Sequence, residues 1–180
     1  MAEQRVRQMA HQDALTGLPN RNLLYGRLER TMSRAKRFGR IFGVGKLDVD
    51  NIKPINDRYG HEMGDAVLKV VATRLLSSIR AIDTVARVGG EEFILVIEEA
   101  NDRSDLKRVA ERILAMVTRP IHVNGNNCSI GVSLGYSVYP DDGENLEGLI
   151  RNADTAMFEV KSKGSNGYRF FKHVPPEGAN

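Results

Sequence analysis

The segment Gly89-Gly90-Glu91-Glu92-Phe93 constrains this chain more than any other. It separates two apolar runs, residues 84–88 and 93–97, which have the length and composition of paired strands, so it marks the tip of a β-hairpin. Two glycines at such a tip free the backbone to turn and let a bulky ligand approach closely. Adjacent carboxylates in a tight turn repel each other, so their presence predicts a positive partner. A divalent metal carrying a phosphate ester is the natural partner.

A second acidic pair, Asp48 and Asp50, ends an apolar segment that begins near Ile41. Side chains alternate along an extended strand, so both carboxylates should point to the same face of a sheet. Mg²⁺ prefers hard oxygen ligands, usually one or two protein carboxylates together with water and substrate phosphate. Each acidic motif alone is also compatible with a solvated strand end. Together they predict a phosphoryl-transfer site where the strand and the hairpin tip meet.

The composition is that of a single ordinary globular domain. The chain has 180 residues, of which 41% are hydrophobic and 27% charged. No apolar run approaches the length of a membrane span, and the first residues do not open a signal peptide. The single Cys128 rules out an internal disulfide and suits a reducing compartment, and we expect it to be a small buried residue rather than a nucleophile.

The basic residues are concentrated at the start of the chain. Residues 1–40 carry a net charge of +6 and the remaining residues −3. No aromatic platform accompanies these basic residues, so we expect solvated helix faces rather than contact with nucleic acid or a membrane.

Hydrophobic periodicity predicts alternating helices and strands. Helices are expected over residues 21–38, 51–59, from Asp65 onward, 106–117 and 146–160, with a loop over 60–64. Strands are expected over 41–49, on either side of Gly89-Gly90, on either side of Asn124-Gly125, over 133–139 and over 168–171. This order predicts an α/β (α+β) domain, a mixed sheet flanked by helices. We expect residues 1–12 to end an upstream signalling helix or linker, 13–172 to form the domain, and 173–180 to be a disordered tail.

Three motifs in this order and spacing resemble the GGDEF family of diguanylate cyclases over nearly the whole domain. The motifs are Asp13-x-Leu15-Thr16-Gly17-Leu18-x-Asn20-Arg21, then Asp48-x-Asp50-x-x-Lys53-x-x-Asn56-Asp57-x-x-Gly60-His61-x-x-Gly64-Asp65, then Gly89-Gly90-Glu91-Glu92-Phe93. The resemblance implies a palm-like domain with a central mixed five-stranded sheet wrapped by helices, similar to nucleotidyl cyclase catalytic domains. It also implies an activity, the condensation of two GTP molecules into cyclic di-GMP and pyrophosphate.

The same resemblance implies a working arrangement and its partners. Two domains would meet as a homodimer, each holding one GTP and two Mg²⁺ or Mn²⁺ ions in its GTP site. The 3′-hydroxyl of one GTP would attack the α-phosphate of the other. An upstream sensor domain and a bacterial cytoplasmic location, as the output domain of a larger protein, are also implied.

The resemblance assigns roles to particular residues of this chain. The metal ligands would be Asp48, the Val49 carbonyl, Glu91 and Glu92, with Glu92 also helping to deprotonate the attacking hydroxyl. Substrate would be bound by Ile52, Lys53, Asn56, Asp65 and Lys161. Asn56 and Asp65 would select guanine, because a carboxylate accepts from both N1–H and the N2 amino group, which adenine lacks. Outside this framework, Asp65 would be read as a helix N-cap.

A second site for the product is implied by Arg80-x-x-Asp83, at the spacing of the family's inhibitory site before Gly89. Arg80 would bind phosphate and guanine of cyclic di-GMP, Asp83 would accept from guanine, and Arg112 would add a contact. A four-residue motif of this kind is also a common helix-end ion pair. Product bound here would inhibit the enzyme by feedback between distinct sites.

The chain departs from the family's pattern at several positions. Ile52 stands where the family usually has Phe, and Ser165 where it usually has Arg or Lys, a loss of positive charge that Lys163 could restore. Gly45 and Lys46 interrupt a strand that should be apolar, and we expect Lys46 to lie on an open face or to extend its ammonium to water. The expected consequence is weaker GTP binding or slower turnover.

Two alternatives remain open at this stage. The first is a catalytically weak or inactive domain that binds GTP or cyclic di-GMP as a module, which the departures favour and the intact acidic motifs oppose. The second is a polymerase-like nucleotidyltransferase acting on nucleic acid, which the missing basic, aromatic-rich groove disfavours.

Overall fold

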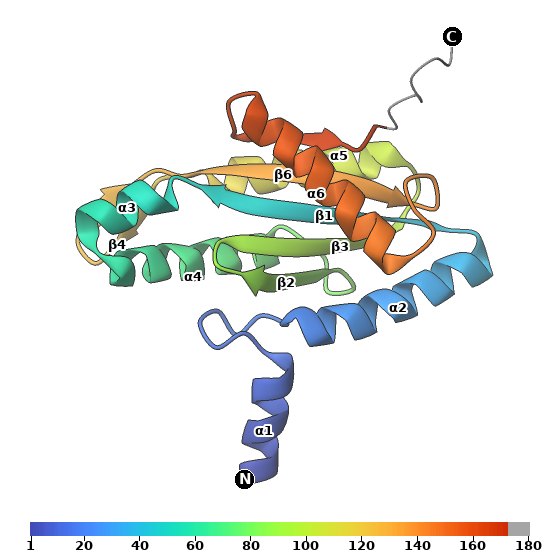
Figure 1. Cartoon of the computed structure of the whole chain (residues 1–180), viewed down its shortest axis with the longest axis horizontal. Helices are drawn as coiled ribbons and strands as arrows, with labels where there is room; N and C mark the ends of the chain where they lie inside the picture. Colours follow the sequence, from blue (N-terminus) through green and yellow to red (C-terminus); the bar gives the residue numbers. More distant parts are fainter. Residues whose placement is uncertain (173–180) are drawn as a thin grey trace.

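A computed structural model describes residues 1–172 of the chain (Figure 1). The helices are α1 (Ala2–His11), α2 (Arg21–Phe38), α3 (Ile52–Tyr59), α4 (His61–Ser77), α5 (Arg103–Val117) and α6 (Leu146–Ser162). The strands are β1 (Ile41–Asp50), β2 (Thr84–Gly89), β3 (Glu92–Ala100), β4 (Ile121–Val123), β5 (Asn126–Cys128), β6 (Gly131–Tyr139) and β7 (Gly167–Phe170). A five-stranded sheet has the order β2-β3-β1-β6-β7, and β4 and β5 form a separate hairpin. The predicted fold class, a mixed sheet wrapped by helices, is confirmed.

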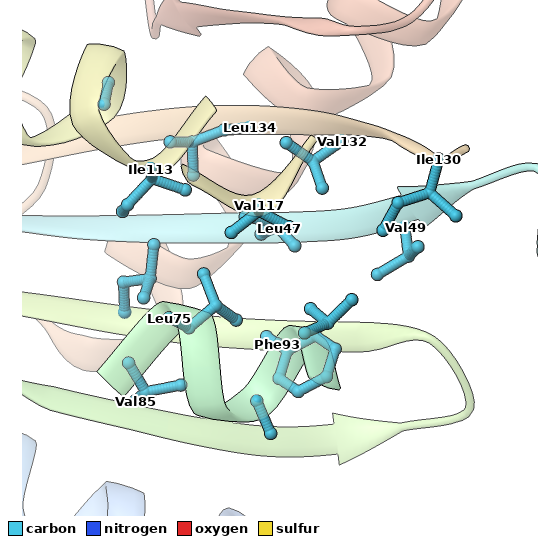
Figure 2. Packing of buried hydrophobic residues seen from close by; sticks show 14 of the residues in the cluster. Leu47, Val49, Leu75, Val85, Phe93, Ile113, Val117, Ile130, Val132 and Leu134 are labelled. Carbon is cyan, nitrogen blue, oxygen red and sulfur yellow. The ribbon is translucent and has the colours of Figure 1, made fainter. Parts of the chain in front are cut away.

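Both faces of the sheet are covered, which explains why its strands read as continuous apolar runs. Helices α4 and α5 pack on one face against Leu47, Phe93 and Leu134, as Figure 2 shows for part of this cluster. Helices α2 and α6 pack on the other face, against Val44 and Ile94. The neighbouring strands are antiparallel except for β6 and β7, which run parallel. Strand β1 therefore lies at the centre of the sheet, and Asp48 and Asp50 lie at its C-terminal end, just before α3.

The junction between α3 and α4 differs from the prediction. A loop over residues 60–64 was expected, but α4 begins at His61 and only Gly60 separates the two helices. Gly60 has φ 92° and ψ 165°, a conformation that other residues rarely adopt, so one residue is enough to break the helix. Glu62 then lies in the first turn, where the helix dipole favours a negative charge. The interpretation of Asp65 as an N-cap is consequently wrong, because Asp65 lies inside α4.

Other predicted boundaries need smaller corrections. Asn20 caps α2 as expected, its side chain accepting from the Leu23 N–H at 3.1 Å. The expected strand over 128–132 is divided between β5 and β6, since the chain leaves the small hairpin before Gly131 and joins the main sheet. Cys128 is half-buried rather than fully buried, and burial raises the pKa of its thiol. The tail predicted for residues 173–180 lies outside the described residues.

Glycines in the sheet allow close approach of neighbouring elements. Gly45, which looked out of place in an apolar strand, lies beneath Tyr136, whose Cε1 would be 3.0 Å from a Cβ at position 45. Gly135 in β6 lies directly beneath α6, and a Cβ there would overlap the backbone of Ala153 and Met157. The contact between β6 and α6 therefore depends on the absence of a side chain at position 135.

Helix α1 accounts for nearly all of the N-terminal segment, and none of its residues is buried. It projects from the sheet domain at the end of α2 that carries the loop of residues 12–20 (Figure 1). Within residues 1–172, no helix combines the length and the hydropathy that crossing a membrane requires.

We predict opposite effects of alanine at two glycines that both lie inside regular elements. Gly135→Ala should lower the free energy of unfolding by about 3 kcal/mol or more, because α6 must move away from β6. Gly26→Ala, in α2 with nothing within 4 Å of its Cβ position, should raise it by about 0.5–1 kcal/mol. Urea denaturation of both variants checks this, and equal effects would contradict the close approach of α6.

Candidate active site

Strand pairing brings the two acidic motifs together at the end of β1. Asp48 pairs across the sheet with Glu92 of β3, and the Val49 N–H donates to the Glu91 carbonyl at 3.0 Å. Asp48 is buried, with 7% of its surface exposed, whereas Glu91 and Glu92 are half-buried. The hairpin tip is thus fastened to the strand that carries Asp48, and the predicted meeting of the two motifs is confirmed.

The turn itself is held by an arginine that sequence reasoning overlooked. The guanidinium of Arg87 donates from Nε and Nη2 to the Gly90 carbonyl, at 2.9 and 2.7 Å, and its Nη1 is 3.1 Å from Asp13 Oδ1. Asp13 also accepts from the N–H and hydroxyl of Thr16. The first and third sequence motifs are therefore physically connected, and a charged residue inside an otherwise apolar strand was the available signal.

The two glycines of the turn fit only one half of the role predicted for them. Neither Gly89 nor Gly90 has a φ in the left-handed region, so the turn does not need their conformational freedom. A Cβ at Gly90 would meet nothing within 4 Å, and one at Gly89 would meet only Glu92 Oε2 at 3.9 Å. The glycines leave this side of the turn bare, which is the property that close approach of a ligand requires.

The acidic cluster has an excess of negative charge. Burial raises the pKa of Asp48, and the charges of Glu92 and Asp50 add to that effect, while Lys161 opposes it. Burial, followed by the charge of Asp48, likewise raises the pKa of Glu91. Carboxyl groups whose ionisation is made costly in this way attract a cation. Lys161 of α6 already supplies one, because its Nζ lies 2.6 Å from Asp48 Oδ2.

The donor set fits a divalent metal in part. Asp48 and Glu91 offer hard oxygen ligands, each with its pKa raised, and the ammonium of Lys161 stands in for a cation beside Asp48. Across residues 1–172, however, no three side chains of the His, Cys, Asp or Glu types gather closely enough to hold a metal ion. The carboxylates of Asp48, Glu91 and Glu92 are therefore near one another without forming one closed ligand set.

Asp50 serves the fold rather than the acidic pair. Its carboxylate accepts from the Ser133 hydroxyl at 3.0 Å and from the Asn166 N–H at 3.1 Å. The bond from Asn166 fastens the turn between α6 and β7, in which Ser165 and Asn166 have φ of 63° and 52°. Ser165, where the family was expected to carry a positive charge, thus lies in a turn that Asp50 holds against the end of β1.

The residues expected to bind the nucleotide lie on α3 and α4, directly after β1. Lys53 and Asp65 are exposed, and their side chains form no hydrogen bond or ion pair with other described residues. Asn56 Oδ1 is buried and has no partner there, an arrangement that proteins rarely leave uncompensated. Ile52 is 5% exposed and packs into the core, so it supports α3 from beneath instead of presenting its side chain outward.

The expected product site is built from two exposed arginines and one buried aspartate. Asp83 accepts from the N–H groups of Arg80 and Glu98, both at 2.9 Å, and only 1% of its side chain is exposed. Arg80 is half exposed and also donates to the Glu98 carbonyl, and Arg112 donates from Nε to the Ser78 carbonyl at 2.9 Å. Arg80, Arg108 and Arg112 line a groove of about 310 Å³ between β3 and α5. The structure brings Arg80 and Arg112 together, while the Asp83 carboxylate is occupied by backbone N–H groups and by the guanidinium of Arg80, whose Nε lies 3.3 Å from Asp83 Oδ2.

Comparison with known proteins identifies the family. A family model described as "Diguanylate cyclase, GGDEF domain" matches residues 10–167. The chain belongs to the GGDEF family. A solved structure of the GGDEF domain of the Pseudomonas aeruginosa protein TpbB (YfiN) is 35% identical, covers 90% of this chain and 95% of that one, and superimposes with a TM-score of 0.88.

Curated GGDEF relatives carry more than one activity in their names. The chain is 42% identical over 171 residues to the bifunctional diguanylate cyclase/cyclic di-GMP phosphodiesterase MucR of Pseudomonas aeruginosa. The matched region covers 95% of the chain and 25% of MucR. It is 36% identical over 166 residues to the cyclic di-GMP phosphodiesterase NbdA of the same species, covering 92% of the chain and 21% of NbdA. The chain thus spans a quarter or less of the length of these relatives.

We predict that Gly64 is required to accommodate Asn56. A Cβ at position 64 would overlap Asn56 Oδ1, so Gly64→Ala should lower the free energy of unfolding by about 1–3 kcal/mol. In an Asn56→Ala background the same substitution should cost close to nothing, because the overlapping atom is gone. Urea denaturation of the four variants measures the coupling, and an equal cost in both backgrounds would contradict this placement of Asn56.

Proposed function

We propose that this domain is a diguanylate cyclase, which joins two GTP molecules into cyclic di-GMP and releases pyrophosphate. The observation that carries the proposal is the meeting of two kinds of site at the end of β1. A cluster of carboxylates with excess negative charge lies there, and α3 and α4 directly follow with the unpartnered Asn56 Oδ1 and the exposed Asp65. The first kind of site suits a metal-bound phosphate and the second a purine base.

The residues of the chain divide the work by their chemistry. Asp65 accepts from the N1–H and N2 amino groups of guanine, and the Asn56 amide bonds its O6 or an N–H edge. Lys53 is exposed and pairs with phosphate, and Lys161 exchanges Asp48 for phosphate when the nucleotide enters. Asp48, the Val49 carbonyl and Glu91 would hold Mg²⁺ or Mn²⁺. When bound, the metal neutralises the triphosphate and lowers the pKa of the attacking hydroxyl.

The reaction requires two copies of the domain. Each chain offers one acidic cluster and one base site, so it binds one GTP, and the second GTP must come from a second chain facing it. The 3′-oxygen of one GTP bonds to the α-phosphorus of the other as pyrophosphate leaves, and Glu92 takes up the hydroxyl proton. A second, reciprocal attack closes the ring. We further propose that an upstream sensor brings the two copies together, in the cytoplasm of a bacterium.

A second candidate is a binding module that holds GTP or cyclic di-GMP without turning it over. It is favoured by Ser165, which leaves the turn after α6 with one positive charge fewer than the family's pattern. Relatives named as cyclic di-GMP phosphodiesterases also carry this kind of domain. The acidic cluster with Asp48, Glu91 and Glu92 all present favours the active enzyme over the module.

The proposal is tested by incubating the purified domain at high concentration with GTP and Mg²⁺ and identifying the nucleotides by mass spectrometry. We expect cyclic di-GMP and pyrophosphate from the wild type, and a loss of turnover of about 100-fold or more in Glu92→Ala. Glu144→Ala, an exposed glutamate in the loop before α6, serves as the matched control with wild-type turnover. Bound nucleotide without turnover would establish the binding module instead, and turnover retained by Glu92→Ala would remove its catalytic role.

We also propose that cyclic di-GMP inhibits the enzyme at the groove lined by Arg80 and Arg112. Arg80→Lys keeps the charge but loses the planar pair of donors, so the product concentration for half-inhibition should rise by about tenfold. Arg151→Lys, on the exposed side of α6, is the matched control. An inhibition curve unchanged by Arg80→Lys and also by Arg112→Lys would remove the regulatory site from the account.

A further inference from the structure

Lys46 occupies a position in β1 where the family's pattern calls for an apolar residue, and its side chain is only 11% exposed. It pairs in the sheet with Ile94 of β3 and Gly135 of β6. Its Nζ lies 3.4 Å from Glu92 Oε2 and 3.6 Å from Asp154 Oδ1 of α6. The expectation that Lys46 lies on an open face is therefore wrong, because most of its side chain is covered. Its stem is buried in the fold, and its ammonium meets two partly exposed carboxylates, one from β3 and one from α6.

The ammonium of a mostly covered lysine has to be compensated, because taking an unpaired charge out of water costs several kcal/mol, on the order of the stability of a small domain. Glu92, with 38% of its side chain exposed, and Asp154, with 53%, provide that compensation. Lys46 points along the same side of β1 as Asp48, two residues further on, whose own partner is Lys161. The cluster therefore contains two separate ion pairs, Lys161 with Asp48 and Lys46 with Glu92.

The ion pair between Lys46 and Glu92 leaves Glu91 as the carboxylate of the hairpin tip that can join Asp48 in holding a cation. Glu92 is drawn toward Lys46, and within the described part of the chain no three acidic, His or Cys side chains come close enough together to hold a metal. Asp48 and Glu91 are then the two carboxylates left with raised pKa values and an attraction for a divalent cation.

We propose that Lys46 is a positioning residue that holds Glu92 by an ion pair and keeps it from coordinating a divalent cation at Asp48 and Glu91. The inference rests on the proposed function for the identity of the cation site. It assigns Glu92 to proton transfer alone, in contrast to the expectation from the family that Glu92 is also a metal ligand. In this arrangement the negative charge of Glu92 is balanced by the ammonium of Lys46 and not by a metal ion.

The test is titration of Mn²⁺ alone, without nucleotide, followed by electron paramagnetic resonance of the free ion. Lys46→Met keeps the length of the side chain, removes the charge and releases Glu92, so Mn²⁺ should bind about tenfold more tightly. The double variant Lys46→Met/Glu92→Gln removes both members of the pair without changing the net charge. Its Mn²⁺ affinity should remain within about threefold of the wild type, because neither residue is a ligand.

Two further variants serve as controls. Lys46→Arg keeps the charge and should match the wild type, and Asp154→Asn removes the other partner of Lys46 while leaving its pair with Glu92 intact. Thermal unfolding of every variant shows whether it is folded, and if Lys46→Met alone does not fold, the charge-neutral double variant decides the question. A loss of tenfold or more in the double variant would show that Glu92 is a ligand and overturn the proposal, as would unchanged or absent Mn²⁺ binding in Lys46→Met.

This measurement separates the failure of the positioning role from the failure of the proposed function. Mn²⁺ binding needs no turnover. If the Mn²⁺ affinities are as expected but the domain makes no cyclic di-GMP, only the proposed cyclase activity is overturned. Turnover by the wild type together with a tenfold loss in the double variant would overturn only the role of Lys46. In an active domain, Lys46→Met should also lower kcat more than it raises KM for GTP, because Glu92 is misplaced while the base and phosphate contacts remain.

Discussion

The balance of charge at the end of β1 is the constraint on which the site depends. Asp48 is buried next to Glu92 in the sheet and near Asp50 and Glu91, an arrangement that would be unfavourable without cations. Lys161 and Lys46 supply two positive charges from α6 and β1, and the backbone and Ser133 satisfy Asp50. What remains is an attraction for a further cation at Asp48 and Glu91. The site is thus assembled around negative charge that the protein compensates only in part.

Small residues and arginines keep this cluster in place. Gly135 lets α6 approach the sheet closely enough for Lys161 and Asp154 to reach the end of β1, and Gly64 makes room for Asn56 between α3 and α4. Arg87 ties the hairpin tip to Asp13 in the loop that follows α1. The geometry of the acidic cluster consequently depends on packing and ion pairs contributed by all parts of the domain, from the N-terminal loop to the last helix.

Much of this architecture was predictable from the sequence, because long periodic segments and turn residues express local preferences. The helix over 21–38 and both hairpins were predicted for this reason. The start of α4 was not, because a single glycine at position 60 broke the helix where a loop was expected. Lys46 and Asp50 were misjudged for a different reason. Their partners, Glu92, Asp154, Ser133 and Asn166, are distant in the sequence, and strand alternation gives the face of a side chain but not what covers it.

Among the functional residues, too, some could be predicted from the sequence and others depend on tertiary contacts. Order and spacing of the motifs were enough to find Asp48, Glu91 and Glu92 and to place Asn56 and Asp65 after the central strand. The sequence could not show that the Asp83 carboxylate is occupied by backbone N–H groups, or that Ile52 faces the core, since both depend on tertiary burial. The two glycines correctly marked the location of the candidate site, but the physical reason was only half correct. They leave the surface of the turn bare, but they do not need unusual dihedral angles.

The most direct test of the account is a crystal structure of the domain with Mn²⁺ and a GTP analogue that cannot react at its α-phosphate, using the anomalous signal to locate the metal. We predict a metal between Asp48 and Glu91, Lys161 moved from Asp48 to phosphate, and guanine against Asn56 and Asp65. Metal or base density elsewhere, with the bond between Lys161 and Asp48 unchanged, would contradict the account that this partly compensated acidic cluster is the site of nucleotide chemistry.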